Sequence, residues 1–289
     1  MSRTGTTVGP RKLVQRLGGP IAPVFSICVM LTDWVEYDEC MASFRAHGFD
    51  EDRCEFLVMD NSATNQADAY VALNEFLQAA TGIYVVLCHQ DLLLLDAGRV
   101  ELEARLAELD RIAPNWGVCG NAGSMDDGWP AIGLAHPDET LVAGNLPQKV
   151  VSLDENFLVA RRIANLALSR DLSGFHHYGS DICTIAAILG WEAYAIDFLL
   201  LHKSHGTFDD SWARSNAAIE AKYARALAPR RVHLVNGRSF LLGGTQVGRR
   251  LARVAQVIGK ASGLVAKNRD HYNAAKRTRR DQRRAQRKL

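Results

Sequence analysis

Residues 83–91 read IYVVLCHQD, an unbroken apolar run that ends at His89, Gln90 and Asp91. The run has the length of a strand and lacks the alternation of apolar and polar residues that a half-exposed strand shows. It therefore predicts a strand at 83–88 that is buried on both faces of a sheet. The three polar residues mark the point where the chain leaves that sheet.

The chain before this strand repeats a pattern of strand followed by helix. Apolar runs at residues 24–31 and 55–59 predict two further strands, and residues 34–46 and 69–80 have helical spacing of their apolar residues. Strands that alternate with helices imply right-handed crossovers and a parallel sheet. The sequence therefore predicts an α/β fold with a mostly parallel sheet flanked by helices.

Polar residues follow each of the three predicted strands. Ligands of such sheets bind outside the carboxyl ends of the strands, so these polar clusters are expected to converge. The first two clusters are Thr32 with Asp33, and Asp60 with Asn61 and Ser62. The second cluster equally fits a helix N-cap, while its carboxylate could accept hydrogen bonds from a ribose or a base.

The third cluster, residues 89–91, has the chemistry that a diphosphate leaving group needs. Such a group is stabilised by a divalent cation held on carboxylates, and Asp91 could supply one ligand. His89 could supply a nitrogen ligand or a hydrogen bond to phosphate. The alternative is a strand that exits into a polar loop.

Downstream of residue 91 the pattern is less regular. The expected elements are a helix at 100–111, strands at 116–123, 155–160 and 192–201, a loop-rich stretch at 128–145, and helices at 181–190 and 240–266. Asp181 could act as a general base or as an acid favoured at a helix start. His202 and His205 follow the last strand, where a histidine could complete a metal shell with Asp91.

In order and spacing, these motifs resemble family 2-type GT-A glycosyltransferases over residues 25–212. In that family a strand runs into Asp-Asp/Asn-x-Ser, a long helix follows, and the next strand ends in Asp-x-Asp. Residues 60–62 and 89–91 stand at those two positions, the second as a His-Gln-Asp variant. Asp181 stands where the family has its catalytic base, and His202 resembles its late metal- or phosphate-binding histidine.

The resemblance implies a Rossmann-like GT-A domain that transfers a sugar from a nucleotide-sugar donor to a hydroxyl, with inversion, in bacterial cell-surface glycan synthesis. Asp181 would be the base. Asp91 and His202, or alternatively His205, would hold Mn²⁺ or Mg²⁺. The residues expected at the donor are Thr32, Asp33, Asp60, Asn61, Ser62, His89 and Gln90. Because His89 replaces the first acid, and an imidazole compensates a cation less well than a carboxylate, the sequence leaves open whether a metal is needed.

Composition fits a soluble protein of 289 residues with 47% hydrophobic and 23% charged residues. Six cysteines without a C-x-x-C pair indicate buried thiols of a reducing compartment rather than a zinc site. The longest apolar runs are of strand length, and the N-terminus lacks an apolar signal core. These features lead us to expect a cytoplasmic protein.

Charge separates the body of the chain from its end. Residues 267–289 hold ten Lys or Arg against two Asp, a charge of +8 in a chain of +2 overall. We expect a flexible basic segment at 1–21, the GT-A domain at 22–235, and an amphipathic helix with a basic tail at 236–289. The tail is either solvated or a contact for an anionic membrane surface, which would suit a glycan or lipid-linked acceptor. Nucleic acid is less favoured, because aromatic residues are scarce there.

Three other functions remain open from the sequence. A GT-A-like module could bind a nucleotide sugar or glycan without turnover. A nucleotidyltransferase would need a glycine-rich basic loop after the first strand, and residues 31–34 (LTDW) do not provide one. A membrane- or nucleic-acid-associated scaffold would depend on the basic tail for its function.

Overall fold

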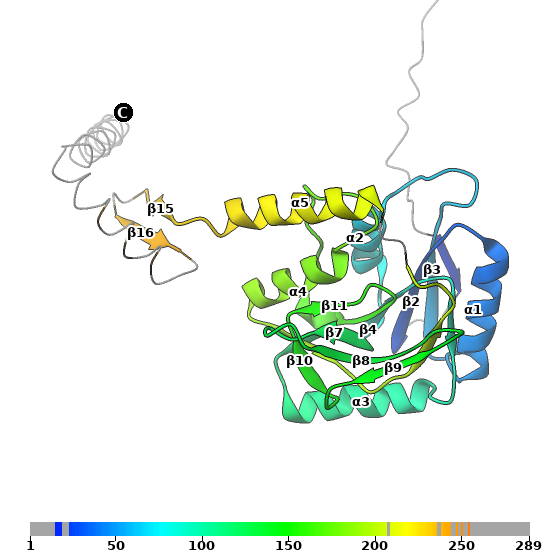
Figure 1. The fold of residues 1–289 in the computed structure, drawn as a ribbon. Helices are drawn as coiled ribbons and strands as arrows, with labels where there is room; N and C mark the ends of the chain where they lie inside the picture. The colour runs from blue at the N-terminus through cyan, green and yellow to red at the C-terminus, as the bar shows by residue number, and fades with distance from the viewer. Residues whose placement is uncertain are drawn as a thin grey trace, which may run out of the picture. The chain divides into compact units, whose positions relative to one another are not determined.

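The protein is described here from a computed structural model (Figure 1). The structure describes residues 15–18, 23–206, 209–235 and 238–243, together with positions 247, 250 and 254. The basic tail and most of the helix expected at 240–266 lie outside these residues.

The chain divides into two compact units, Met1–Ile219 and Glu220–Leu289. In the second unit, β15 (Arg230–His233) and β16 (Ser239–Leu242) form an antiparallel hairpin. Residues 240–242 are therefore a strand where the sequence predicted the beginning of a helix, and that part of the prediction is wrong. Cross-strand pairing with residues 230–232 decides their conformation over helical spacing.

Further strands and helices make up the rest of the described chain. The strands are β1 (Gln15–Gly18), β2 (Phe25–Leu31), β3 (Cys54–Asp60), β4 (Tyr84–Cys88), β5 (Leu92–Leu94), β6 (Trp116–Gly120), β7 (Ala122–Ser124), β8 (Pro130–Ala135), β9 (Thr140–Ala143), β10 (Gln148–Val150), β11 (Ser152–Leu153), β12 (Phe157–Arg161), β13 (Glu192–Ala195) and β14 (Leu200–His202). The helices are α1 (Trp34–Ala46), α2 (Ala69–Ala79), α3 (Arg99–Ile112), the short 3₁₀ helix η1 (Arg162–Ala164), α4 (Tyr178–Leu189) and α5 (Asp210–Ala226).

An eight-stranded sheet is the centre of the first unit, with the strand order β1-β3-β2-β4-β12-β6-β13-β10. β2 pairs in parallel with both β3 and β4, which confirms the parallel arrangement expected for the first three predicted strands. β12 lies between β4 and β6 and is antiparallel to both. The expected α/β class, with a sheet flanked by helices, is confirmed, but beyond β4 the sheet is mixed.

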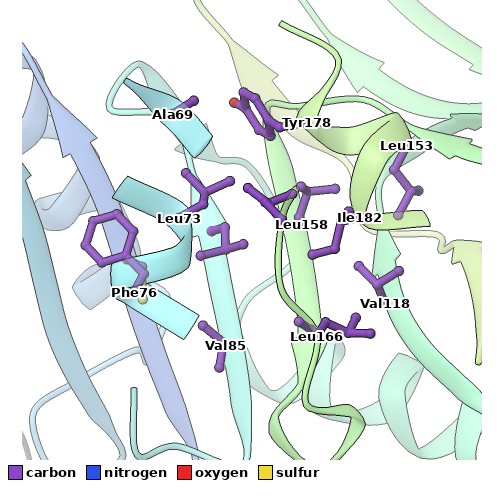
Figure 2. Close-up of a cluster of buried hydrophobic side chains, with 14 of the residues drawn as sticks. Ala69, Leu73, Phe76, Val85, Val118, Leu153, Leu158, Leu166, Tyr178 and Ile182 are labelled. Carbon is purple, nitrogen blue, oxygen red and sulfur yellow. The ribbon is translucent and has the colours of Figure 1, made fainter. Parts of the chain in front are cut away.

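Helices cover both faces of this sheet. One buried cluster joins α2 and α4 to the sheet, and the other joins α1 and α3 to its opposite face. Figure 2 shows Leu73 of α2, Leu158 of β12 and Ile182 of α4, which all belong to the first of these clusters. The central strands are apolar on both faces because each face is covered by helices.

Side chains at the helix starts fix where the chain turns. Asp33 caps α1 by accepting a hydrogen bond from the Val35 N–H at 2.7 Å. Asp68 caps α2 through Oδ1 and accepts a second hydrogen bond from the Gly174 N–H through Oδ2 at 3.0 Å. This second bond ties the start of α2 to the segment that precedes α4.

β5 and strands that follow β6 form a second, smaller sheet, with the order β11-β7-β8-β14-β5 and β9 paired to β8. The prediction of a loop-rich stretch at 128–145 is wrong, because β8 and β9 form an antiparallel hairpin there. The single strand expected at 192–201 is two strands, β13 and β14, in different sheets. These strands are short, and their pairing partners rather than their own pattern define them.

The N-terminal strand β1 has no counterpart in the sequence-based prediction. It pairs antiparallel with β3 at the edge of the large sheet. Residues 15–18, which fall in the segment expected to be flexible, are therefore part of the sheet.

All six cysteines are buried free thiols. Burial raises the pKa of Cys40 and of Cys54 to about 12, which keeps both as neutral, unreactive thiols. Within the described part of the chain, no helix has the length and apolar character required to cross a bilayer.

Candidate active site

The parallel strands bring their polar ends to one edge of the sheet. Leu31 at the end of β2 lies opposite Asp60 of β3, and Val29 of β2 lies opposite Cys88 of β4. The loops that follow these three strands therefore begin side by side, as the pattern predicted.

The second sheet adds His202 to this edge. β14 pairs antiparallel with β5, which places His202 opposite Leu92 and next to the residues that follow β4. His202 Nε2 lies 3.3 Å from Asp91 Oδ1 and 3.3 Å from His89 Nδ1. The three ligand atoms lie within 4.8 Å of one another, so one ion could contact all three.

The charge state of this trio suits a cation. Burial acts to raise the pKa of Asp91, but hydrogen bonds from His202 and Ser204 and the nearby imidazoles outweigh it and hold that pKa far below its ordinary value. Burial, together with His202, lowers the pKa of His89. Asp91 is thus an ionised carboxylate, and His89 is an imidazole that favours its neutral form. The neutral imidazole is the form that binds metals.

A tyrosine fixes which nitrogen of His89 faces the trio. The Tyr178 hydroxyl donates to the Glu155 carbonyl at 3.1 Å and lies 2.8 Å from His89 Nε2. Because the hydroxyl has only one proton, His89 Nε2 must carry its own proton and donate it to the tyrosine oxygen. Nδ1 is then left with a free lone pair toward Asp91 and His202, which is the tautomer that a metal ligand requires.

Gln90 holds a neighbouring turn. Its Oε1 accepts from the Thr32 N–H at 2.7 Å and the Asp33 N–H at 3.1 Å, and its Nε2 donates to Thr32 Oγ1 and to Glu36. The amide group is therefore occupied in joining the loop after β4 to the turn between β2 and α1. It positions that turn, and Asp33 is used as the cap of α1.

The cluster after β3 divides into an exposed acid and a buried amide. Asn61 is buried and bonds through its side chain to the backbone of residues 66 and 67. Asp60 Oδ1 accepts from the Ser62 N–H at 2.9 Å and the Ser62 hydroxyl at 2.6 Å. Those two bonds lower the pKa of Asp60, so an ionised carboxylate stands at the exposed end of β3.

Asp181 lies in the first turn of α4 and is fully buried. One carboxylate oxygen accepts from the Ser169 N–H at 2.7 Å and the other from the Ser169 hydroxyl at 2.6 Å. Asp181 thereby fastens the chain before α4 to the helix. It is not among the residues that line the cavity beside the trio.

That cavity has a volume of about 370 Å³. Its lining contains an unusual number of histidines, with acids and aromatic residues beside them. The residues are His89, Leu134, His136, Leu153, Asp154, Glu155, Phe175, His176, His177, Ser180, His202, His205, Gly206 and Trp212.

His205, the alternative ligand suggested by the sequence, stands apart from the trio. Its ring stacks on His136 at 4.3 Å between centroids, and its Nε2 lies 2.9 Å from Asp138. His136 in turn bonds through Nδ1 to the His202 carbonyl at 3.1 Å. His205 and His136 thus border the cavity and support His202.

Sequence reasoning missed Asp154 and Glu155, which precede β12, and Trp212, which lies on α5. The Asp-Glu pair directly before an apolar strand was the signal that could have drawn attention to the first two. Trp212 gave no signal, because α5 itself was not predicted.

Comparison with known proteins gives one curated relative at high similarity. A protein of Fuscovulum blasticum named ATP synthase subunits region ORF 6 is 37% identical over 231 residues, which is 76% of this chain and 92% of the relative. That name states no activity. No protein-family model matches the chain.

Similar solved structures have low sequence identity. A mannosyltransferase of Pyrobaculum calidifontis, in complex with GDP-Man and Mn²⁺, has a TM-score of 0.48 and 15% identity, over 77% of this chain and 68% of that one. TarS 1–349 of S. aureus, in complex with UDP-GlcNAc, has a TM-score of 0.44 and 11% identity, over 64% and 59% of the two chains. By the identity and coverage of the curated relative, the chain belongs to the family of the Fuscovulum blasticum protein.

Proposed function

We propose that the protein is a GT-A-type glycosyltransferase, which moves a sugar from a nucleotide-sugar donor to a hydroxyl acceptor. The observation that carries this proposal is the convergence of His89, Asp91 and His202 at the carboxyl edge of the parallel strands, beside a cavity of about 370 Å³. Ligands of α/β sheets bind at that edge, and the volume is in the range of small-molecule sites.

The donor atoms of the trio fit a divalent cation. Two imidazole nitrogens and one carboxylate oxygen suit Mn²⁺ better than Mg²⁺, which prefers an all-oxygen shell. When bound, such a cation would neutralise charge on the diphosphate that leaves the sugar. His89, Asp91 and His202 would hold it, and Tyr178 would keep the His89 ring in its ligand tautomer.

Residues around the trio have supporting parts in this proposal. Gln90 holds the turn at Thr32 and Asp33 in place, so that the backbone there is fixed before the donor binds. The ionised Asp60 lies exposed at the end of β3, where it could accept hydrogen bonds from a ribose or a base. Ser62 and Asn61 keep the loop that carries Asp60 in shape.

The finer parts of the proposal concern the acceptor. We propose a single displacement with inversion onto a hydroxyl of a glycan or lipid-linked glycan, in cell-surface glycan synthesis. A single displacement needs one proton acceptor near the acceptor hydroxyl. Contact of the basic tail with an anionic membrane surface would bring the enzyme to such an acceptor.

The test is release of nucleoside diphosphate from a panel of UDP-, GDP- and dTDP-sugars, with Mn²⁺, with Mg²⁺ and with EDTA. Wild type is compared with Asp91→Asn and with Asp52→Asn, the same change at an exposed acid far from the site. Release by wild type and Asp52→Asn, lost in Asp91→Asn, is the expected result. No release and no thermal stabilisation by any donor would contradict the proposal.

A second candidate is a module that binds a nucleotide sugar without turnover. Two observations favour this second candidate: Asp181, the expected base, is buried, and both of its carboxylate oxygens are bonded to Ser169. Asp181 is therefore not among the residues that line the cavity. This candidate predicts donor binding with the donor left intact.

A further inference from the structure

We propose that Glu155 is the catalytic base of this site, and that its carboxylate takes the proton of the acceptor hydroxyl bound in the cavity. This inference rests on the proposed function, because it names the proton acceptor for that reaction. The role of base, which was expected of Asp181, thereby falls to a residue on a different element.

The first observation is an unpartnered oxygen. Glu155 lines the cavity together with His89, and its Oε1 is buried without a hydrogen-bond partner among the described residues. A buried carboxyl oxygen without a partner destabilises the folded state unless another molecule satisfies it. A hydroxyl of a bound acceptor, or a water in its absence, would satisfy that oxygen once the Glu155 side chain turns it toward the cavity.

The second observation is that His177 has the same feature. His177 also lines the cavity, and its Nε2 is buried without a partner among those residues. It precedes α4 with a φ of 65°, in the left-handed region that non-glycine residues seldom adopt. Such backbone conformations persist where the surrounding structure imposes them and often occur at functional sites.

Close packing brings Glu155 to the start of α4. A Cβ at Gly179 would lie 2.2 Å from the Leu153 carbonyl oxygen and 3.4 Å from Glu155 Cγ, so only glycine permits this approach. The backbone N–H groups of residues 177–179 then favour the charged form of Glu155. They would stabilise the carboxylate when it forms.

The environment of Glu155 suits a base that works near neutral pH. Burial is the main reason that its pKa is raised to about 8, and the charge of Asp154 acts in the same direction. The N–H groups at the start of α4 oppose that shift. A carboxyl with a pKa near the working pH transfers protons efficiently in either direction.

The groups that face Glu155 come from three elements. Asp154 is its chain neighbour, and His177 and Tyr178 stand at the start of α4. His89, which follows β4, lines the same cavity. Tyr178 donates its proton to the Glu155 carbonyl, so it does not compete for the carboxylate. The cavity thus offers Glu155 as a proton acceptor and His177 as a hydrogen-bond partner for one hydroxyl.

The reaction balances with these groups. The acceptor oxygen forms a bond to the anomeric carbon while the bond from that carbon to the diphosphate oxygen breaks. The electron pair of the broken bond leaves with the nucleoside diphosphate, and the acceptor proton passes to Glu155. With water as the acceptor, the products are the free sugar, the nucleoside diphosphate and a proton.

The experiment uses this slow hydrolysis, because it needs no knowledge of the natural acceptor. The full chain is incubated with the donor that most stabilises it against heat, and nucleoside diphosphate release is measured for wild type, Glu155→Gln, Asp181→Asn and Glu75→Gln. Glu75 lies on α2 outside the cavity and controls for the loss of a glutamate charge. Donor affinity is measured for each variant by its thermal shift.

We expect Glu155→Gln to lose release at least about a hundredfold while the donor stabilises it as it does wild type. Glu75→Gln should match wild type, and a further variant, Glu155→Asp, measured in the same way, should recover part of the rate. Release by Glu155→Gln within about threefold of wild type would overturn the inference and leave the proposed function standing. Loss in Asp181→Asn but not in Glu155→Gln would return the role to Asp181. A wild type that no donor stabilises would overturn the proposed function and this inference together.

Discussion

The N-terminal part of the chain, up to and including residue 91, and the longer C-terminal part after it reach the same site by different means. In the N-terminal part, β2, β3 and β4 are buried on both faces and lie in parallel, and α1 and α2 pack on opposite faces. In the C-terminal part, short strands such as β9 and β14 are defined by the strands they pair with. The N-terminal part supplies His89 and Asp91, and the C-terminal part supplies His202 and Glu155.

A regular local pattern thus builds the scaffold, while residues from less regular segments complete the site. Core burial should then dominate stability in the N-terminal part. The C-terminal part should tolerate substitution on its exposed strands but not at the cavity.

Phe76→Ala should have the largest effect on stability. Phe76 of α2 is fully buried, so its truncation leaves a cavity and costs about 3–5 kcal/mol. The contrasting change in the C-terminal part is Val142→Ala on β9, where the side chain is 73% exposed and the cost should stay within about 0.5 kcal/mol. Urea unfolding of both variants measures the two costs. Equal costs would show that core burial at α2 does not dominate stability.

Glu155→Gln should stabilise the protein in a pH-dependent way. The pKa of Glu155 is raised by burial to about 8 in the folded state from an ordinary 4.5, so the folded state holds its proton more tightly than the unfolded state. The stability that this gives is present below about pH 4.5 and is lost as the pH rises toward 8.

Glutamine does not titrate and therefore escapes this loss. The difference in melting temperature between Glu155→Gln and wild type should grow by several degrees between pH 5 and pH 8.5, since the shift is on the order of a few kcal/mol. Melting curves at both pH values, with Glu75→Gln as the control, test this. A constant difference would mean that Glu155 is not held in its protonated form.

Tyr178→Phe should weaken metal binding while the fold persists. It removes the oxygen that accepts from His89 Nε2, so the His89 ring loses the contact that fixes its tautomer. Loss of such a contact typically lowers metal affinity about 10- to 100-fold. Calorimetric titration with Mn²⁺ measures the change. Unaltered affinity would remove Tyr178 from the site.

Gln90→Ala should have the smallest of these effects. Two backbone N–H groups, of Thr32 and Asp33, lose their acceptor, but both lie at an exposed turn where water replaces it. We expect a cost of about 1 kcal/mol in unfolding and a weaker thermal shift by the donor. A cost above about 3 kcal/mol would show that the turn between β2 and α1 depends on Gln90 more than its exposure suggests.

Apart from β1, the sequence predicted the helices and strands of the N-terminal part closely. The bounds of α1 and the polar ends of β2, β3 and β4 follow from the apolar runs, because a strand buried on both faces has no polar residue until it leaves the sheet. His202 was also expected beside Asp91. That expectation came from the resemblance and from its place after a strand.

The elements and site residues that the sequence did not predict depend on contacts between segments far apart in the chain. The β8–β9 hairpin contains Gly, Pro and exposed residues, so its pattern is that of a loop, and only pairing with β7 and β14 makes it a sheet. Asp181 fits an N-terminal helix position and a base equally well in sequence, and its contacts with Ser169 form only in the folded chain. The Asp-Glu pair before an apolar strand points to Glu155 as a polar residue at a strand start, but the burial that raises its pKa depends on the packing of α4 and is not a property of its neighbours in sequence.

The most direct test of the site is whether Mn²⁺ binds at His89, Asp91 and His202, where the N-terminal and C-terminal parts meet. Calorimetric titration of metal-free protein with Mn²⁺, followed by the nucleoside diphosphates UDP and GDP, would be run on wild type, Asp91→Asn and Asp52→Asn. We predict one saturable Mn²⁺ site in wild type and Asp52→Asn, nucleotide binding that depends on Mn²⁺, and loss of both in Asp91→Asn. Binding that is unchanged in Asp91→Asn, or absent from wild type, would contradict the account.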